Sequence, residues 1–432
     1  MKNVQVITLG CYKNLVDSER VMQQLELNGF KLIFENDNSE YRDFVIINTC
    51  GFIHDAKTES INTILEQVSL KNHGKRGKLI VFGCLSQRYK DLIKQEIPEV
   101  DYFFGKFAFE DILKTLNCEI KERAITQRTI TTPAHYSYLK ISDGCNRKCA
   151  FCAIPLITGR HKSTPIDLLV KEANFLASQG VKEIILIAQD LNQYGNDLDS
   201  KSNLYELINR LSDIETIEWI RLQYLYPKGF PKKLPLLFAS NPKLCNYIDI
   251  PFQHASNKIL KRMLRGHTYE DNIRIINELR STVPDISIRT TLITGFPGET
   301  SKDFDLLLKF VEETRFDLLG AFSYTHEDST TAVKRYNDTV SKKVKNNRLN
   351  TLMTLQQEIS LQKNLYKIGT IQRVIIDSED NNSYSGHNQY NSPEVDDKII
   401  IPKSQNINIQ TGSFYDVKIS DARHYDLIGD CL

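Results

Sequence analysis

The stretch YSYLKISDGCNRKCAFC (136–152) joins an apolar strand pattern to three closely spaced cysteines. We expect the strand over 136–142, and Cys145, Cys149 and Cys152 follow it as a C-x3-C-x2-C array. Thiolates favour zinc or iron–sulfur clusters, but structural zinc takes four ligands, usually in pairs, and no second pair follows here. The array is therefore expected to hold a four-iron cluster through three of its irons and to leave the fourth iron open.

Five further strand patterns follow along the central segment, 131–362, and helical patterns separate them. Their spacing of roughly 30–45 residues is typical of βα units that build a parallel sheet. Six such strands fit a partial (β/α)6 barrel, whose active site would lie on the C-terminal rim beside the cysteine loop. The five strands are expected at 183–189, 219–225, 247–253, 286–294 and 317–324.

The N-terminal segment, 1–122, carries three more cysteines, each one or two residues beyond an expected buried strand. The strands alternate with helical patterns, so a parallel α/β sheet is expected. Ligands bind beyond the carboxyl ends of such strands, so the three thiols can meet at one edge. A free cysteine is also a common small core residue, and this alternative stays open for each thiol taken alone. The strands are 4–9, 44–48 and 79–82, and the cysteines are Cys11, Cys50 and Cys84.

The C-terminal segment, 366–432, has short strand patterns at 371–377, 397–402 and 413–420, separated by turn residues, which predicts a small OB-like β-barrel. It holds ten acidic and six basic side chains, a net charge of −4. Phosphate binding relies on Lys and Arg, so this acidity favours a basic protein partner over RNA. A solvated surface without partner preference is the alternative, and the basic run 334–348 is expected to be a solvated helix face or connector.

The composition excludes several classes of protein. Lys and Arg number 55 against 54 Asp and Glu, a formal net charge of +1, which gives no global case for nucleic acid or an anionic membrane. No apolar run approaches the roughly 18 residues that span a bilayer, and the first residues lack a secretory signal pattern. We therefore expect a cytoplasmic protein, in which nine cysteines favour metal or redox chemistry over disulfides.

The Cys145 loop at the head of a partial barrel resembles that of the radical S-adenosylmethionine enzymes. The resemblance implies that S-adenosylmethionine chelates the open iron and is cleaved reductively to methionine and a 5′-deoxyadenosyl radical. The segments 188–195, 251–254 and 291–299 end the second, fourth and fifth strands, where that family needs polar or glycine-rich residues. The cofactor contacts expected from these segments and from the cysteine loop are Phe151, Gln189, Asp190, Gln253, Gly295 and Gly298.

A radical barrel between a three-cysteine α/β domain and a small β-barrel resembles the methylthiotransferases over essentially the whole chain. The resemblance implies that Cys11, Cys50 and Cys84 hold a second 4Fe–4S cluster with an open iron, which would carry or donate sulfur. A second S-adenosylmethionine would supply the methyl group, and an electron donor such as a flavodoxin or ferredoxin would supply electrons. The C-terminal barrel would be a TRAM-like substrate-binding domain.

Two branches of that family compete as the closest resemblance. One modifies isopentenyl-adenosine in transfer RNA, and the other methylthiolates the β-carbon of a specific aspartate in ribosomal small-subunit protein S-twelve, giving 3-methylthioaspartate. The motifs GCYKNLVDSE (10–19), NTCGFI (48–53) and FGCLSQRY (82–89) look like the second branch, where Lys–Asn follows the first cysteine. We therefore expect the ribosomal protein as substrate, with the transfer RNA enzyme as the alternative. A non-catalytic iron–sulfur or zinc scaffold protein is the alternative from another class.

Overall fold

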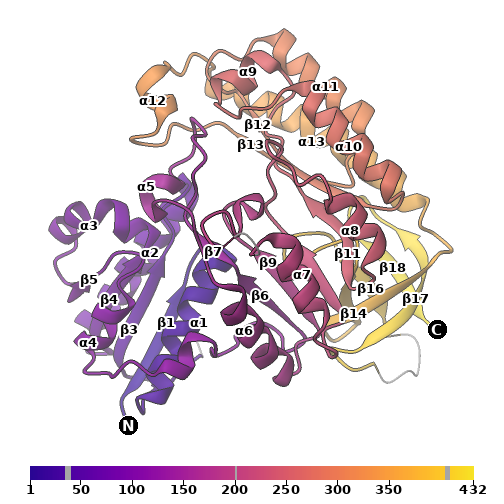
Figure 1. Cartoon of the computed structure of the whole chain (residues 1–432). Coiled ribbons are helices and arrows are strands. Elements are labelled where there is room, and N and C mark those ends of the chain that lie inside the picture. The colour runs from indigo at the N-terminus through magenta and orange to yellow at the C-terminus, as the bar shows by residue number, and fades with distance from the viewer. Residues whose placement is uncertain (35–39, 200–201, 404–408) are drawn as a thin grey trace.

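The computed structural model describes residues 1–34, 40–199, 202–403 and 409–432, which form three main sheets and the helices that cover them (Figure 1). The N-terminal sheet, in indigo and violet, lies on one side of the central sheet, and the yellow C-terminal barrel lies on the other. This arrangement confirms the expected fold class of a parallel α/β sheet, a partial barrel and a small β-barrel.

The N-terminal sheet is parallel, with the strand order β2-β1-β3-β4-β5, and helices cover both faces. Alternate residues of β4 point to opposite faces: Leu79 and Val81 cluster with α2 and α3, whereas Ile80 and Phe82 cluster with α1 and α4. Burial on both faces explains why these strands are continuous apolar runs. The elements are β1 (Asn3–Thr8), α1 (Tyr12–Leu27), β2 (Lys31–Leu32), β3 (Arg42–Thr49), α2 (His54–Asn72), β4 (Arg76–Gly83), α3 (Cys84–Glu96), β5 (Tyr102–Phe103), α4 (Phe109–Thr115) and the 3-10 turn η1 (Glu122–Ile125).

The central sheet is parallel and open, with the order β13-β12-β11-β10-β9-β6. In β10, Ile220 and Leu222 join the large apolar core under the helices, whereas buried Arg221 between them points to the inner face. The strands are β6 (Tyr136–Lys140), β9 (Glu183–Ile187), β10 (Trp219–Leu222), β11 (Leu244–Asp249), β12 (Ser287–Thr294) and β13 (Leu318–Ser323). The flanking elements are the hairpin β7 (Ser142–Asp143) and β8 (Lys162–Ser163), η2 (Leu191–Gln193), α5 (Ile154–Thr158), α6 (Ile166–Ser178), α7 (Leu204–Ser212), α8 (Leu234–Ser240), α9 (Asn257–Arg262), α10 (Tyr269–Thr282), α11 (Ser301–Thr314), α12 (Thr331–Arg335) and α13 (Lys342–Leu365).

All six strands expected in the central segment are present, but two of them, 219–225 and 247–253, end three or more residues before their apolar patterns do. Tyr224 and Gln253 have positive φ angles of 71° and 70°, outside the β region. Regular pairing therefore stops before each residue, although Gln253 keeps an isolated bridge to Leu292 of β12, and both side chains line the cavity described below.

The C-terminal sheet is a closed barrel with the order β14-β15-β16-β18-β17. The three strand patterns of the sequence correspond to β14, β16 and β17, whereas β15 and β18 were missed. The sequence of β15, SYSGHN, lacks apolar alternation because its buried residues are Gly386, His387 and Asn388. The strands are β14 (Ile371–Glu379), β15 (Ser383–Asn388), β16 (Ile399–Pro402), β17 (Phe414–Ala422) and β18 (Leu427–Cys431).

The basic run 334–348 is only partly the solvated face or connector that its charge predicted. Lys334, Arg335, Lys342 and Lys343 are exposed, as expected, but the other two basic residues are paired with acids. Lys345 is only 6% exposed and its ammonium group binds the Asp338 carboxylate, while Arg348 binds Glu299 at 2.7 Å. Helix α13, which carries both residues, packs against β13 and α11. Asp338 lies in the run itself, whereas Glu299 comes from the loop after β12, and the sequence gives no sign of that second pair.

One carboxylate joins the N-terminal and central sheets. Asp17 on α1 is 1% exposed, and it accepts a hydrogen bond from Lys106 at 2.9 Å and another from Lys140 of β6. Burial raises the pKa of Asp17, but the two ammonium groups outweigh it and lower the pKa to about 2. The ring of Tyr12 also stacks on that of Tyr138, with centroids 4.0 Å apart. The two sheets are thus held in one relative position by a buried polar contact and a ring stack.

We expect Asp17→Asn to lower the free energy of unfolding by about 3–5 kcal/mol, because it leaves two buried ammonium groups without their shared partner. Urea titration measures the change. Asp167→Asn is the control, since Asp167 pairs with Arg210 at the surface, where a pair contributes about 1 kcal/mol or less. Equal effects of the two substitutions would contradict the bridging role of Asp17.

Polar contacts also hold the C-terminal barrel against the central sheet. Buried His387 on β15 contacts Glu183 of β9 at 2.6 Å and Asp377 of β14 at 2.8 Å. Burial lowers the pKa of His387, but the two carboxylates outweigh it and raise the pKa to about 9. Asp377 also lies 2.8 Å from His135, which precedes β6. At neutral pH, His387 is therefore a buried cation that links the two domains.

Stability should consequently fall in alkaline solution. The raised pKa of His387 means that its contribution is complete below about pH 6.5, its ordinary pKa, and is lost as the pH rises through about 9. We expect the free energy of unfolding to fall by about 3 kcal/mol over this range. Urea titrations across the range measure the loss, and His387→Gln should show a smaller one. The same pH dependence in both proteins would refute the assignment.

Candidate functional site

All six cysteines singled out in the sequence line one cavity of about 310 Å³. The N-terminal sheet contributes one triad to its wall and the loop after β7 contributes the other. A cavity of this size and with walls from two domains is typical of small-molecule and cofactor sites. The lining cysteines are Cys11, Cys50, Cys84, Cys145, Cys149 and Cys152.

The first triad meets because β1, β3 and β4 are parallel neighbours whose carboxyl ends share an edge. Cys11 directly precedes α1, Cys50 directly follows β3, and Cys84 begins α3 after β4. Gly10 allows the close approach: its φ is 88°, and a Cβ there would lie 2.7 Å from the Cys50 sulfur. The topology therefore assembles three thiols from distant parts of the sequence.

The three thiols of this triad differ in acidity. Burial raises the pKa of Cys84 to about 12 and also raises that of Cys50. Burial acts on Cys11 as well, but the ammonium groups of Lys13 and Lys106 outweigh it and hold its pKa below the ordinary value. Cys11 is thus the member of the triad that most readily provides a thiolate, the form that binds metals.

The second triad lies on the loop between β7 and α5, where several donors face the sulfur atoms. The backbone N–H of Arg147 donates to the Cys145 sulfur at 3.4 Å, and burial raises the pKa of this thiol to about 11. The Cys149 sulfur lies 3.2 Å from the Tyr226 hydroxyl and accepts from Arg265 at 3.4 Å. Hydrogen bonds to ligating sulfurs are one of the means by which proteins tune an iron–sulfur cluster.

Thiols are the common donor type of both triads. Among the residues that the structure describes, no three His, Cys, Asp or Glu side chains lie close enough to hold a single metal ion. Soft thiolates suit iron–sulfur clusters, in which each ligand binds a different iron and the ligands are spread around the cluster. Three thiols on the loop, with donors aimed at their sulfurs, fit a four-iron cluster that keeps one iron open.

Only some of the other expected cofactor contacts line the cavity. Phe151, Gln189 and Gln253 line the cavity beside the second triad. Asp190 is not part of the lining, but its carboxylate accepts from Arg147 Nε at 2.6 Å, and Arg147 is part of it. Asp190 can therefore act on a ligand only through the guanidinium that it positions.

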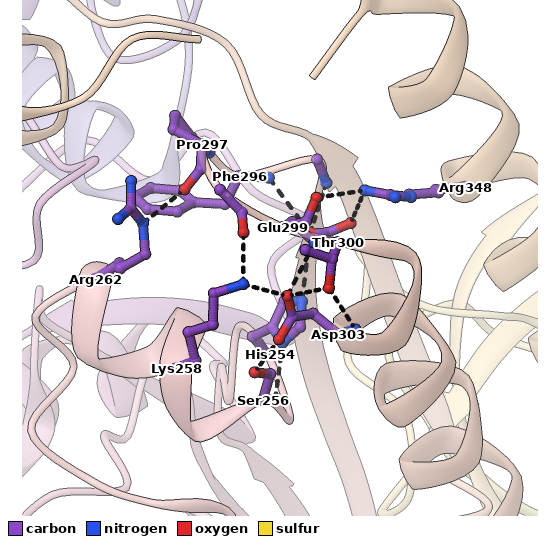
Figure 2. A network of polar contacts seen from close by, with 12 residues as sticks. His254, Ser256, Lys258, Arg262, Phe296, Pro297, Glu299, Thr300, Asp303 and Arg348 are labelled. Carbon is purple, nitrogen blue, oxygen red and sulfur yellow. Dashed lines mark hydrogen bonds and ion pairs between the residues drawn. The ribbon is translucent and has the colours of Figure 1, made fainter. Parts of the chain in front are cut away.

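Gly295 and Gly298 are absent from the cavity lining as far as the described residues define it. Figure 2 shows how their loop is held: the Glu299 carboxylate accepts from the Gly295 N–H at 2.8 Å and from Arg348 at 2.7 Å. Both glycines have positive φ, and a Cβ on Gly295 would collide with Lys345. In this structure the glycines shape the loop after β12, and their role toward the cofactor stays a prediction.

Sequence reasoning missed the positive charge of the cavity. No Asp or Glu is found in the lining within the described chain, whereas four basic side chains are. Two of these lie within the cysteine motifs, so their closeness to a cysteine in the sequence could have indicated them. The other two come from distant segments and had no signal in the sequence. The four are Lys13, Lys106, Arg147 and Arg265.

Three family models match the chain: the radical SAM superfamily over residues 139–311, the uncharacterized protein family UPF0004 over 3–105 and the TRAM domain over 368–432. The ribosomal protein uS12 methylthiotransferase RimO of Christiangramia forsetii is 48% identical, over 99% of this chain and 94% of the relative. The protein of the same name from Flavobacterium johnsoniae is 47% identical, over 99% of this chain and 97% of the relative.

Solved structures share the fold at low sequence identity. The radical S-adenosylmethionine methyltransferase TsrM from Kitasatospora setae, with cobalamin and a 4Fe–4S cluster bound, gives a TM-score of 0.54 at 14% identity, over 75% of this chain and 72% of that one. The cobalamin-dependent S-adenosylmethionine radical enzyme OxsB gives 0.51 at 13% identity, over 83% and 56%.

The fold and the thiol loop together define a radical S-adenosylmethionine protein, for which an iron–sulfur cluster and S-adenosylmethionine are the cofactors. Within that class, the chain belongs to the RimO family of ribosomal protein uS12 methylthiotransferases. The search for membrane spans among the described helices found none of sufficient length and apolarity.

Proposed function

We propose that this chain is an enzyme that methylthiolates the β-carbon of a specific aspartate in ribosomal protein uS12, giving 3-methylthioaspartate. The observation that carries the proposal is a single cavity lined by both thiol triads. Replacing a C–H bond by a C–S bond needs a radical source and a sulfur source within reach of one carbon. Identity of 47–48% over nearly the whole chain to two uS12 methylthiotransferases supports the same substrate.

In this proposal each triad holds a 4Fe–4S cluster with one open iron: Cys145, Cys149 and Cys152 hold the first, and Cys11, Cys50 and Cys84 the second. When bound, the first cluster supplies the electron that cleaves S-adenosylmethionine into methionine and a 5′-deoxyadenosyl radical, and the second supplies sulfur that a further S-adenosylmethionine methylates. A flavodoxin or ferredoxin would deliver the electrons.

The side chains around the second triad bind and orient. Asp190 fixes the Arg147 guanidinium, whose central carbon also lies 4.1 Å from the centre of the Tyr226 ring. Gln189 and Gln253 offer amide groups to the amine and carboxylate of the methionyl end of S-adenosylmethionine. Phe151 forms an apolar part of the wall and keeps water from the radical.

Each domain has its own role. The domain over 1–122 would hold the auxiliary cluster, the domain over 131–362 would generate the radical, and the barrel over 366–432 would bind the substrate. The barrel contacts the central sheet through His387 and Glu183, so a protein bound to it would lie beside the radical domain. Its acidic surplus would suit a basic ribosomal protein.

The substrate is tested directly. Anaerobically reconstituted enzyme is incubated with S-adenosylmethionine, a reductant and either uS12 or isopentenyl-adenosine transfer RNA, and the products are weighed by mass spectrometry. We expect uS12 to gain one methylthio group and the RNA to gain none. A mass gain on the RNA alone would identify the transfer RNA enzyme, and absence of 5′-deoxyadenosine with both substrates would identify a scaffold protein.

Cysteine variants test the two clusters. We expect Cys149→Ala to abolish 5′-deoxyadenosine formation, whereas Cys50→Ala should retain some cleavage and lose methylthiolation. Each should lower iron from about eight to about four atoms per chain, since each cluster holds four. Cys118→Ala is the matched control, because Cys118 is a half-buried thiol outside the cavity lining. Full methylthiolation by Cys50→Ala would refute the second cluster.

A further inference from the structure

The cavity is lined by several positive charges, and the protein supplies hydrogen-bonding partners for only some of them. Within the described part of the chain its lining includes four basic side chains and no carboxylate. Thiol triads alone do not require four cations, and the four differ in whether the protein already supplies a partner. The four are Lys13, Lys106, Arg147 and Arg265.

Three of the cations are bound by the protein itself. Lys106 donates to Asp17 at 2.9 Å, and Arg147 donates to Asp190 at 2.6 Å. Arg265 donates to a cysteine sulfur and to a backbone carbonyl. Each of these side chains has a fixed position, and a charge or dipole of the protein balances each of them.

Lys13 is the exception. It is 5% exposed, and its ammonium nitrogen lies 3.8 Å from the centre of the Tyr224 ring. No hydrogen bond or ion pair joins this nitrogen to another residue of the described chain. The nearby carboxylate of Asp249 is bound instead by Arg289 at 3.2 Å. The Cys11 thiolate attracts the ammonium group electrostatically, but no anion is hydrogen-bonded to it, and a buried ammonium group in that state is costly.

Lys13 lies where an anion bound to it would be close to both triads. Lys13 lies in the first turn of α1, two residues after Cys11, and is therefore beside the N-terminal triad. Tyr224 follows β10 of the central sheet, and its positive φ of 71° turns it into the cavity. The ammonium group therefore lies where the two domains meet, with one face covered by the ring.

We propose that Lys13 binds the carboxylate of the substrate aspartate and makes the site selective for an acidic side chain, an inference that rests on the proposed function. In aspartate the carboxylate is attached directly to the β-carbon. An ammonium–carboxylate hydrogen bond at this point fixes that carbon inside the cavity lined by both triads. The Tyr224 ring limits the directions from which the carboxylate approaches and adds a cation–π contact.

The test compares peptides of uS12 that carry either the target aspartate or asparagine in its place. Full-length reconstituted enzyme and its Lys13→Met variant are assayed for peptide binding by fluorescence polarisation and for methylthiolation by mass spectrometry. We expect the wild-type enzyme to prefer aspartate and Lys13→Met to lose about 10–100-fold of that preference, the usual contribution of a charged hydrogen bond. Lys13→Arg, which keeps the charge, should recover part of it.

Lys78→Met is the matched control. Lys78 also lies over a tyrosine ring, that of Tyr102 at 5.2 Å, but on β4 and outside the cavity lining. It should keep the wild-type preference for aspartate. Loss of the preference in Lys13→Met with iron content equal to that of Lys78→Met would support the proposal.

Three results would overturn it. One is an unchanged aspartate preference in Lys13→Met. Another is a loss of iron from Lys13→Met alone, which would mean that the ammonium group serves the Cys11 thiolate instead. A third is an unchanged preference together with a higher S-adenosylmethionine requirement, which would assign Lys13 to the carboxylate of the cofactor. If wild-type enzyme modifies neither peptide nor intact uS12, the proposed function itself fails, a result distinct from the other three.

Discussion

The shared carboxylate of Asp17 is the contact on which the site depends. The first thiol triad lies at the edge of the N-terminal sheet and the second on the loop after β7, so their relative position depends on how the two domains pack. Asp17 accepts hydrogen bonds from a lysine of each domain, and at 1% exposure it leaves the pair little freedom to shift. A buried carboxylate with two cationic partners tolerates few alternative geometries, because movement away from either lysine weakens the pairing of a buried charge. Together with the Tyr12–Tyr138 stack and the Arg20–Glu172 ion pair at 2.9 Å, this contact sets the relative position of the two triads.

The C-terminal barrel shows how charge counted along a sequence differs from charge presented to a partner. Asp377 contacts two histidines, the hydroxyl of Tyr136 donates to Glu394 at 2.6 Å, and Asp396 binds Arg289 at 3.0 Å. These three of the ten acidic residues hold the barrel on the central sheet and are not free to attract a basic protein. Part of the negative charge that disfavoured RNA therefore serves to hold the barrel on the central domain. The exposed surface of the barrel carries a smaller excess of acidic residues than the count along the sequence.

Much of the fold and the cysteine set could be predicted because each depends on short-range signals. Strands buried on both faces are continuous apolar runs, and parallel strands place the residues that follow them at a common edge. Cys11, Cys50 and Cys84 were found in this way although they are far apart in the sequence. Strand β15 was missed because its buried residues are polar and small, and they bind across to the central sheet.

By itself, the sequence determined which thiols exist, on which strand ends they lie, and to which family the pattern is similar. Only the tertiary structure decided that both triads line one cavity, because that depends on the contact between two sheets. It also decided which cations are already paired: Lys106 and Arg265 reach the cavity from distant segments, and among the described residues no carboxylate is hydrogen-bonded to Lys13. Spacing along a chain reports local geometry, whereas the balance of buried charge depends on every element packed around it.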